Sequence, residues 1–488
     1  MNLYELFNNT THNYIVNIFK EFIFSWIYYN NYSKIVGEIL NRYYKMVEIK
    51  LLEKSKGLLP RKLEVELLKS LDSKEILVIT GSRQVGKTSL CFRLIDHILN
   101  KRKISHLQVV YIDLEFPPVL SQVNNLYGED FLNYLRSQNV NTDKKVFVFI
   151  DEIHYLENPS SFLKVIHDHF PQIKLIVSGS SSLEIKRKFK ETLTGRKKII
   201  KLNPLDFEEF LLFKKAPIYQ KKKKLSFRKV ILEKSLPDLS EIKFLYSDFE
   251  RYFNEFLIYG GYPGVVLKES NEEKKDALFE IYGSYIRRDI KDFAVIENIN
   301  AFNRLVELLS SQIGSLVNFS ELTTILGVSR PTLENYLFLL EQTFIIKLLK
   351  PFFTNRRQEI IKSPKIFFYD QGLRNAILRN FDSIQERIDK GMIFENCIFT
   401  ELKKNLTVAE ELLFWRSKSN AEVDFLLREK EILPIEVKLN LARLKVPSGM
   451  RSFIVRYTPS AALVINNSIF SQKKIGGTDI FFIPAWAL

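Results

Sequence analysis

A glycine-rich segment of eight residues separates an apolar run from a helical pattern early in the chain. The run Ile76–Ile79 has the composition of a buried parallel strand, and residues 89–99 follow with helical spacing. Between them, Gly81-x4-Gly86-Lys87-Thr88 matches the phosphate-binding loop in full. Glycines let such a loop curl so that its backbone N–H groups face phosphates at the start of the helix. A strand, this loop and a helix, in that order, predict a nucleoside triphosphate site.

The side chains of this loop predict how the nucleotide is held. We expect Lys87 to reach the β- and γ-phosphates and Thr88 to bind Mg²⁺ through its hydroxyl. The predicted cofactors are therefore ATP and Mg²⁺. The residues expected to bind them are Gly81, Ser82, Arg83, Gln84, Val85, Gly86, Lys87, Thr88 and Ser89.

A later apolar run ends in two acids. Residues 146–150 are all apolar, and Asp151 and Glu152 follow directly. An acid at the end of such a strand delivers a carboxylate to the magnesium shell, and we expect Asp151 to do so. We expect Glu152 to orient and activate the attacking water. The two motifs together predict hydrolysis of the nucleotide.

Two further positions have competing candidates. The strand-like run 174–178 ends in Ser178-Gly179-Ser180. A hydroxyl here would contact the γ-phosphate or position the water, unless the segment is only a turn. Ser178 is our candidate, and Ser180 is also eligible. Arg196 would offer positive charge to the nucleotide of a neighbouring subunit, with Arg187 as its rival. The predicted catalytic residues are Lys87, Glu152, Ser178 and Arg196.

The length of the chain and its alternating pattern predict a first domain of the α/β class. At 488 residues the chain exceeds a single core, so we expect roughly two to four domains. Strands alternate with helical stretches over residues 56–212, which predicts a parallel sheet with crossover helices. The chain has only two cysteines, Cys91 and Cys397. Two cysteines make neither a disulfide framework nor a zinc cluster, so a reducing, cytoplasmic location is expected.

Residues 1–55 are expected to form an N-terminal helical extension. The stretch from Tyr14 to Tyr29 is apolar and aromatic, but Lys20 and Glu21 interrupt it. A spanning helix needs about 20 apolar residues. We therefore predict no integral membrane segment, while a peripheral membrane contact through this extension stays open.

Positive charge is concentrated in one stretch. The formal net charge is +15, and residues 214–234 carry nine Lys and Arg against one Glu, including Lys221–Lys224. A basic excess favours a polyanionic partner. Residues 213–240 are interpreted either as a solvated insertion or linker, or as a contact with a nucleic-acid phosphate backbone.

A helix-turn-helix pattern follows a helical, lid-like region. Residues 241–310 are helical in pattern, broken by glycines at 260–264. In residues 311–362, Gly327-Val328-Ser329 makes a turn between two helical patterns, with Ser329 as the cap of the second. Residues 344–346 are placed to begin a wing strand. A winged helix of this kind indicates DNA binding.

The order of these motifs resembles the predicted AAA+-type ATPases of archaea and bacteria that carry a C-terminal domain of unknown function. The resemblance covers roughly residues 60–488, without the lysine-rich stretch. It implies an AAA+ core, a winged helix and a C-terminal fold similar to restriction endonucleases. The matching motifs are residues 81–88, 150–152, 178–180, 195–196, 202–205, 260–263, 287–290, 394–396, 422–424 and 435–438.

The C-terminal region places acids on neighbouring strands. We expect Asp424 to end one strand, and Glu436 and Lys438 to face one side of the next because residues i and i+2 point the same way. Asp424 and Glu436 would hold Mg²⁺ over a phosphodiester, and Lys438 would steady the attacking water. The resemblance adds Glu395, on the preceding helix, to this nuclease-like set. Active cleavage, a nuclease-like fold that does not cut, and simple surface ion pairs all stay open, and Glu422-Val423 departs from the usual Pro-Asp.

The predicted fold class is α/β, with a P-loop NTPase parallel sheet of the AAA+ type followed by a helical and winged-helix module and a restriction-endonuclease-like domain. Three functions fit it. The first, which we prefer, is an ATP-driven enzyme associated with nucleic acid, with DNA as the expected kind. The second is an ATP-gated switch that binds a protein, and the third is a DNA-binding regulator. A homo-oligomer is compatible with all three. The predicted domains are 1–55, 56–212, 213–240, 241–310, 311–362 and 363–488.

Overall fold

The computed structural model describes most of the chain, namely residues 52–179, 193–240, 242–284, 296, 298–355, 357, 359, 362–441 and 444–488. Most of the predicted N-terminal extension lies outside the described residues. So do Ser180, Arg187 and residues 287–290.

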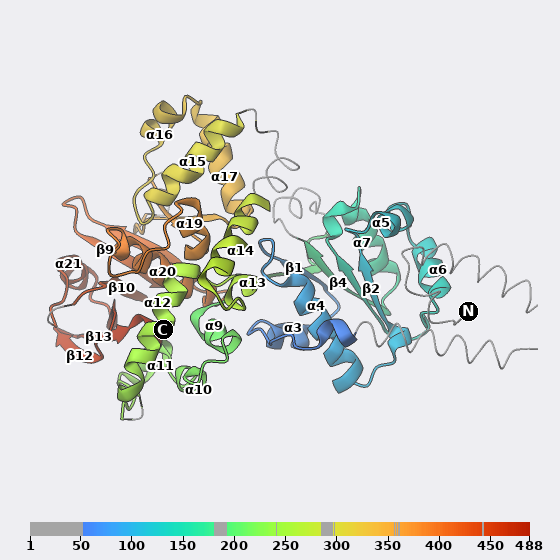
Figure 1. The fold of residues 1–488 in the computed structure, drawn as a ribbon, viewed down its shortest axis with the longest axis horizontal. Coiled ribbons are helices and arrows are strands. Elements are labelled where there is room, and N and C mark those ends of the chain that lie inside the picture. Colours follow the sequence, from blue (N-terminus) through green and yellow to red (C-terminus); the bar gives the residue numbers. More distant parts are fainter. Residues whose placement is uncertain are drawn as a thin grey trace, which may run out of the picture.

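A five-stranded parallel sheet forms the first part of the molecule (Figure 1). Every neighbouring pair in it is parallel, as expected for strands joined through helices. The predicted α/β class with a P-loop type of parallel sheet is therefore confirmed. In spatial order the strands are β2 (Val109–Asp113), β3 (Val146–Asp151), β4 (Ile173–Gly179), β1 (Ile76–Thr80) and β5 (Lys197–Lys201).

Helices cover both faces of this sheet. Because successive residues of a strand point to opposite faces, Leu77 and Ile79 of β1 join one core and Val78 joins another. The first core includes side chains of α3 (Glu64–Ser70) and α4 (Lys87–Asp96). Side chains of α5 (Pro117–Val123), α6 (Glu129–Ser137) and α7 (Pro159–His169) lie in the second. The central strands are thus buried on both sides, and their carboxyl ends form one edge that carries the glycine-rich loop.

The lysine-rich stretch, which we interpreted as an insertion or linker, is folded against the core. After α9 (Phe207–Phe213), it forms α10 (Tyr219–Lys222) and α11 (Phe227–Glu233). Apolar side chains from it, Phe227 and Val230 among them, belong to the main core. Even Lys222 is only 3% exposed, and its ammonium donates to the Leu488 carbonyl at 2.5 Å. The stretch buries one face, because apolar residues alternate with its lysines.

Two adjacent glycines bring the following helices against the parallel-sheet domain. They lie between α12 (Tyr246–Tyr259) and α13 (Pro263–Val266), which α14 (Asn271–Ser284) follows. A Cβ on Gly261 would lie 2.2 Å from the Leu205 carbonyl oxygen, and Gly260 has a φ of +72° beside Asp370. Only glycine fits at both positions, and the close approach places the next residue beside the glycine-rich loop.

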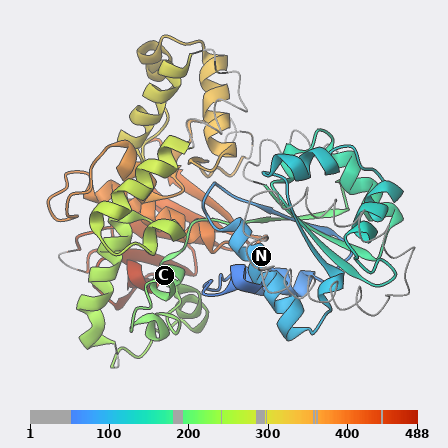
Figure 2. The same ribbon diagram turned by 45° about the vertical axis from the view of Figure 1, so that its right-hand side comes forward.

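A helical pair joined by a short turn projects from the molecule at the top of Figures 1 and 2. It follows α15 (Ile299–Ser311) and consists of α16 (Phe319–Leu326) and α17 (Arg330–Gln342). Gly327 ends α16 at a φ of +64°, and the Ser329 hydroxyl caps α17 by accepting from the Thr332 N–H. The strands β6 (Ile346–Leu349) and β7 (Lys365–Phe368) then pair in antiparallel fashion.

A second, mixed sheet makes up the C-terminal domain, drawn in orange and red in Figure 1. The helix α19 (Gln371–Ile377) precedes the domain, and α20 (Lys390–Lys404) and α21 (Ser448–Tyr457) contribute to the cores on its two faces. In spatial order its strands are β12 (Ser471–Ile475), β13 (Thr478–Pro484), β11 (Ala461–Asn466), β10 (Ile432–Val437), β9 (Glu422–Arg428) and β8 (Glu411–Arg416).

Within the part of the chain that the structure describes, no helix combines the length and apolar character needed to cross a bilayer.

Candidate active site

The glycine-rich loop has the tight backbone that its glycines predict. Gly86 precedes α4 with a φ of +93°, and Gln84 is also left-handed at +59°. A Cβ on Gly81 would lie 2.2 Å from the Leu202 carbonyl oxygen, which belongs to the segment after β5. The loop therefore curls at the first turn of α4, where backbone N–H groups are free of intrahelical partners. Such a loop presents donors to an anion.

Lys87 lies across this loop. Its side chain is buried, and its ammonium donates to the carbonyls of Gly81 at 3.2 Å and Ser82 at 3.1 Å. It also lies 3.8 Å from Glu152 Oε1. A buried positive charge held over a curled loop is the arrangement that a phosphate chain requires. The residues present thus fit a triphosphate.

Asp151 is surrounded by hydroxyl groups. The hydroxyls of Thr88 and Tyr111 lie 2.6 and 2.9 Å from its Oδ2, while the Ser178 hydroxyl donates to Oδ1. The carboxylate ends β3, and Thr88 stands in the first turn of α4, so the structure brings the predicted metal residues together. An Asp and a Thr hydroxyl side by side are oxygen donors that suit Mg²⁺. Tyr111, on β2, was not among the predicted site residues, because a lone tyrosine in an apolar strand carries no motif.

Glu152 occupies a strained position directly after this strand. Its φ is +53°, a left-handed conformation that non-glycine residues adopt rarely. Its N–H donates to Ser178 Oγ at 3.2 Å, and its Oε2 lies 3.1 Å from His154 Nδ1. Burial raises the pKa of the Glu152 carboxyl, but Lys87 and His154 outweigh burial and lower this pKa to about 2. Glu152 is therefore a charged hydrogen-bond acceptor at the edge of the loop.

Arg196 lies away from the loop of its own chain. Its carbonyl accepts from the Ile76 N–H at the start of β1, whereas the glycine-rich loop follows the opposite end of that strand. Its guanidinium pairs with Asp168 at 2.7 Å on the surface. The structure brings Lys87, Glu152 and Ser178 together but not Arg196.

Residues outside the predicted set also reach the loop. Arg61 is buried and donates to the Val85 carbonyl at 2.9 Å, to the Asn203 carbonyl at 2.8 Å and to both carboxylate oxygens of Glu209. The Tyr262 hydroxyl lies 3.3 Å from Ser82 Oγ. Tyr262 follows the glycine pair that approaches this domain, so the loop is supported from two sides.

A cavity of about 100 Å³ adjoins the end of the loop. It is mostly apolar, and its walls come from the segment before β1, from the start of α4 and from the residues that follow Tyr262. Leu58, Leu59, Val85, Gly86, Ser89 and Pro263 are among the residues that line it. The predicted residues Val85 and Ser89 thus face this cavity.

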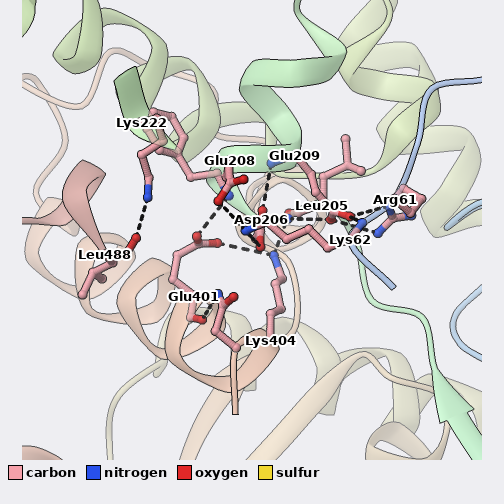
Figure 3. A network of polar contacts seen from close by, with 12 residues as sticks. Arg61, Lys62, Leu205, Asp206, Glu208, Glu209, Lys222, Glu401, Lys404 and Leu488 are labelled. Atoms are coloured by element: carbon pink, nitrogen blue, oxygen red, sulfur yellow. Dashed lines mark hydrogen bonds and ion pairs between the residues drawn. The ribbon is translucent and has the colours of Figure 1, made fainter. Parts of the chain in front are cut away.

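A polar network connects this region with the C-terminal domain (Figure 3). Lys62 pairs with Asp206 at 2.7 Å and with Glu208 at 2.9 Å. From α20, Glu401 accepts from the Phe207 N–H at 3.0 Å, and Lys404 donates to the Leu205 carbonyl at 2.8 Å. The segment 202–207 therefore contacts the glycine-rich loop at Leu202, and its other end contacts the helix α20.

The nuclease-like residues form an acid cluster on one side of the C-terminal sheet. Asp424 on β9 accepts from the Val437 N–H at 2.7 Å, and Glu436 on β10 pairs with Lys438 at 2.8 Å. Burial, reinforced by Asp424, raises the pKa of Glu436 to about 8 and that of Glu395, on α20, to about 7. Glu436 Oε2 is buried and has no hydrogen-bond partner among the described residues. The structure thus brings the four predicted residues into one neighbourhood.

Lys365 completes this cluster. Sequence reasoning missed this residue because it lies 30 residues before Glu395, on β7, whereas Glu395 lies on α20. Its ammonium lies 2.5 Å from Glu422 Oε1 and 3.3 Å from Glu395 Oε1. In the described ranges, no three His, Cys, Asp or Glu side chains are already arranged as metal ligands.

Comparison with known proteins identifies three regions of the chain. Residues 73–211 match the AAA domain, residues 250–383 match a domain of unknown function (DUF8612), and residues 390–488 match another (DUF4143). Residues 73–211 are therefore similar to AAA-type ATPase domains, and residues 390–488 to a C-terminal domain of unknown function.

Two relatives extend over most of the chain. An uncharacterized protein of Methanocaldococcus jannaschii is 27% identical over 387 residues, which are 78% of each protein. An uncharacterized protein of Haemophilus influenzae is 24% identical over 434 residues, or 87% of this chain and 96% of that one. The match to the solved structure of C. elegans PCH-2 covers 49% of this chain and 68% of the PCH-2 chain, at 14% sequence identity. Its TM-score of 0.28 is too low to carry an argument.

Proposed function

We propose that this chain hydrolyses ATP with Mg²⁺ at the site formed by Lys87, Thr88, Asp151 and Glu152. The observation that carries the proposal is the 2.6 Å contact between the Thr88 hydroxyl and Asp151 Oδ2, because these residues come from separate segments. Lys87 Nζ lies against two loop carbonyls and Glu152, and it would exchange these carbonyls for phosphate oxygens. The remaining loop residues from Gly81 to Ser89 would bind phosphates through their N–H groups.

Magnesium, when bound, supplies charge neutralisation to the phosphates, and Thr88 and Asp151 are the residues that would hold it. Glu152 is the acceptor that would orient the attacking water. Its carboxylate adjoins Lys87 and its N–H bonds to Ser178, so it lies between the phosphate site and the end of β4. Ser178 would position Asp151 and the Glu152 backbone rather than contact substrate, since it bonds to both.

The cavity beside the loop would receive the nucleobase. Its walls adjoin Gly86 and Ser89, where the phosphate chain would emerge from the loop, and they are mostly apolar. Apolar walls suit a flat heterocycle. We still propose that Arg196 acts at the nucleotide of a neighbouring subunit. It lies at the other end of β1, away from the loop of its own chain, but it is on the surface.

The test is ATP turnover together with nucleotide binding. Glu152→Gln should bind a fluorescent ATP analogue with nearly wild-type affinity but lose turnover by about 100-fold or more, since the acceptor for water is removed. Lys87→Ala should lose binding. Glu157→Gln, an exposed neighbour, is the matched control. Turnover by Glu152→Gln at the wild-type rate would refute the proposed role.

A second activity is favoured by one specific observation in the C-terminal domain. Glu436 Oε2 is buried without a hydrogen-bond partner among the described residues, beside Asp424 and Lys438. A buried carboxylate oxygen left unpaired is costly unless something binds it. We propose that Asp424 and Glu436 hold a divalent cation, with Lys438 and Glu395 beside it, in a nuclease-like site. Plasmid cleavage with Mn²⁺ that disappears in Asp424→Ala tests this.

Nucleic acid is the partner that we propose for the exposed lysines of residues 213–240, and not for α17. The outer face of α17 carries Arg330, which is neutralised by Glu334 at 2.9 Å, together with an exposed Phe338. A phosphate-binding helix needs a positive face. Lys223 and Lys224, in contrast, are exposed beside α10. The helix-turn-helix pattern is therefore better explained as a packing element.

A further inference from the structure

Lys365 enters the acid cluster from outside the six-stranded sheet. It begins β7, which pairs with β6 and not with the six-stranded sheet. Its side chain is 4% exposed, and its ammonium lies between Glu422 and Glu395, 5.5 Å from the Phe414 ring centre. This lysine is thus fully desolvated inside a site made by other segments.

The cluster holds more acidic than basic side chains, and Lys365 is one of its two cations. Four carboxyl groups, those of Glu395, Glu422, Asp424 and Glu436, surround two ammonium groups, those of Lys365 and Lys438. Lys438 is 42% exposed and pairs with Glu436, whereas Lys365 is buried and pairs with the other side of the cluster. Buried carboxylates require a cation. Lys365 therefore supplies the positive charge that a metal ion would otherwise supply there.

The backbone of Lys365 is clamped to the segment that leads into the helix-turn-helix. Gly314 N–H donates to the Ile366 carbonyl at 2.8 Å, and Ile366 N–H donates to the Ser315 carbonyl at 3.1 Å. On the other side of Lys365, Val317 N–H donates to the Pro364 carbonyl at 2.8 Å. Gly314 also adjoins the Glu395 carboxylate, because a Cβ there would lie 3.3 Å from Glu395 Oε2. The other end of β7 is bonded to α20, where the Asn396 side chain accepts from the Phe368 N–H at 2.8 Å, so Lys365 is held in the cluster from both sides.

We propose that Lys365 is an internal counter-cation that competes with a divalent ion for the acid cluster and so lowers the affinity of the cluster for that ion. The inference rests on the proposed metal site of Asp424 and Glu436. A divalent ion and an ammonium within a few ångströms repel strongly in a buried setting.

The experiment measures Mn²⁺ binding to the full chain without nucleotide, by electron paramagnetic resonance of the free ion. All proteins carry Asp151→Asn, so that the proposed magnesium site of the ATPase domain does not contribute. Lys365→Met is compared with the charge-preserving Lys365→Arg and with Lys347→Met. Lys347 lies on the partner strand β6 and pairs with Glu341, outside the cluster.

We expect Lys365→Met to bind Mn²⁺ about tenfold or more tightly than the parent, and Lys365→Arg and Lys347→Met to match the parent. Adding Asp424→Asn to Lys365→Met should abolish the gain. If Lys365→Met proves too unstable to purify, Lys365→Gln replaces it, because glutamine removes the charge but keeps a hydrogen-bond donor for the neighbouring carboxylates, and it should also tighten Mn²⁺ binding.

Equal affinity in parent and Lys365→Met, lost in Asp424→Asn, would overturn the role of Lys365 and leave the metal site standing. No Mn²⁺ binding in any variant would overturn both. Weaker binding in Lys365→Gln than in the parent would likewise contradict the proposal.

Discussion

The phenol of Tyr111 lies 2.9 Å from Asp151 Oδ2, the same oxygen that the Thr88 hydroxyl contacts at 2.6 Å. Tyr111 and Asp151 lie on neighbouring strands of the sheet, because β2 pairs with β3 in parallel. Burial, reinforced by the Asp151 charge, raises the pKa of the Tyr111 phenol, so it stays a donor. Tyr111 therefore orients the carboxylate that we propose as a magnesium ligand.

Tyr111→Phe should raise the Mg²⁺ concentration needed for half-maximal ATP turnover by about tenfold, because groups that orient a metal ligand typically contribute that much. Turnover at saturating Mg²⁺ should change little. The measurement is a Mg²⁺ titration of ATPase activity, and Tyr134→Phe makes the same chemical change on α6, away from Asp151. Identical Mg²⁺ curves for Tyr111→Phe and wild type would show that the phenol does not support the metal.

Gly81→Ala should destabilise the ATPase domain by about 2 kcal/mol or more and remove ATP binding, since overpacking against rigid backbone is costly. The added Cβ would lie 2.2 Å from the carbonyl oxygen of Leu202, whose N–H is bonded to the Thr80 carbonyl at 2.7 Å. Gly264→Ala is the control, because a Cβ there meets nothing within 4 Å and the residue lies in α13. We expect that change to stabilise by up to about 1 kcal/mol. Urea unfolding distinguishes the two outcomes.

The parts of the site that sequence reasoning reached are those encoded locally. Gly81, Lys87 and Thr88 sit in one loop, and Asp151 ends an apolar run, so spacing alone locates them. The pairing of their strands then follows from parallel topology. These predictions needed no knowledge of how distant segments pack.

The residues that sequence reasoning missed reach their places only through tertiary packing. Arg61 precedes β1 and Lys365 lies on β7, outside the six-stranded sheet, and neither belongs to a motif. The lysine-rich stretch was misleading for a related reason. Its charges suggested that the stretch is exposed to solvent. Phe227 and Val230, however, are spaced so that one face is buried against the core.

Arg61→Lys should raise the KM for ATP severalfold and lower stability by about 1–3 kcal/mol, because at least one buried carbonyl loses its donor. A single ammonium cannot reach Val85, Asn203 and Glu209 together, as the forked guanidinium does. Arg251→Lys changes an exposed pair with Asp248 and should leave both quantities nearly unchanged. An unaltered KM in Arg61→Lys would show that Arg61 does not support the nucleotide-binding loop.

Glu401→Gln should change how stability depends on pH. Burial raises the pKa of Glu401 from 4.5 to about 7, so the folded protein holds this proton more tightly than the unfolded chain. The Glu401 carboxyl therefore destabilises the folded protein least below about pH 4.5. This destabilisation grows as the pH rises to about 7 and is constant above that pH. The glutamine variant does not titrate, so its stability relative to wild type should rise by a few kcal/mol across that window, at about 1.4 kcal/mol per unit of pKa.

Urea unfolding of both proteins at several pH values from 4.5 to 7.5 measures this difference. The shifted Glu395 and Glu436 carboxyls are present in both proteins and cancel. A difference that stays flat with pH would mean that Glu401 is not held protonated in the network with Phe207 and Lys404.

Replacing Lys223 and Lys224 by glutamine should weaken DNA binding and reduce its dependence on salt. The slope of log K against log salt falls by about 0.9 for each phosphate that the protein no longer neutralises, so the double change should lower it by roughly 2. Arg330→Gln on α17 is the comparison, because Arg330 is exposed but already paired with Glu334. A larger effect from Arg330 would return DNA recognition to the helix-turn-helix. If the wild-type protein binds no DNA at low salt, these lysines are not a DNA-binding site. An ATP-gated switch that acts on a protein then becomes the better explanation of the same fold.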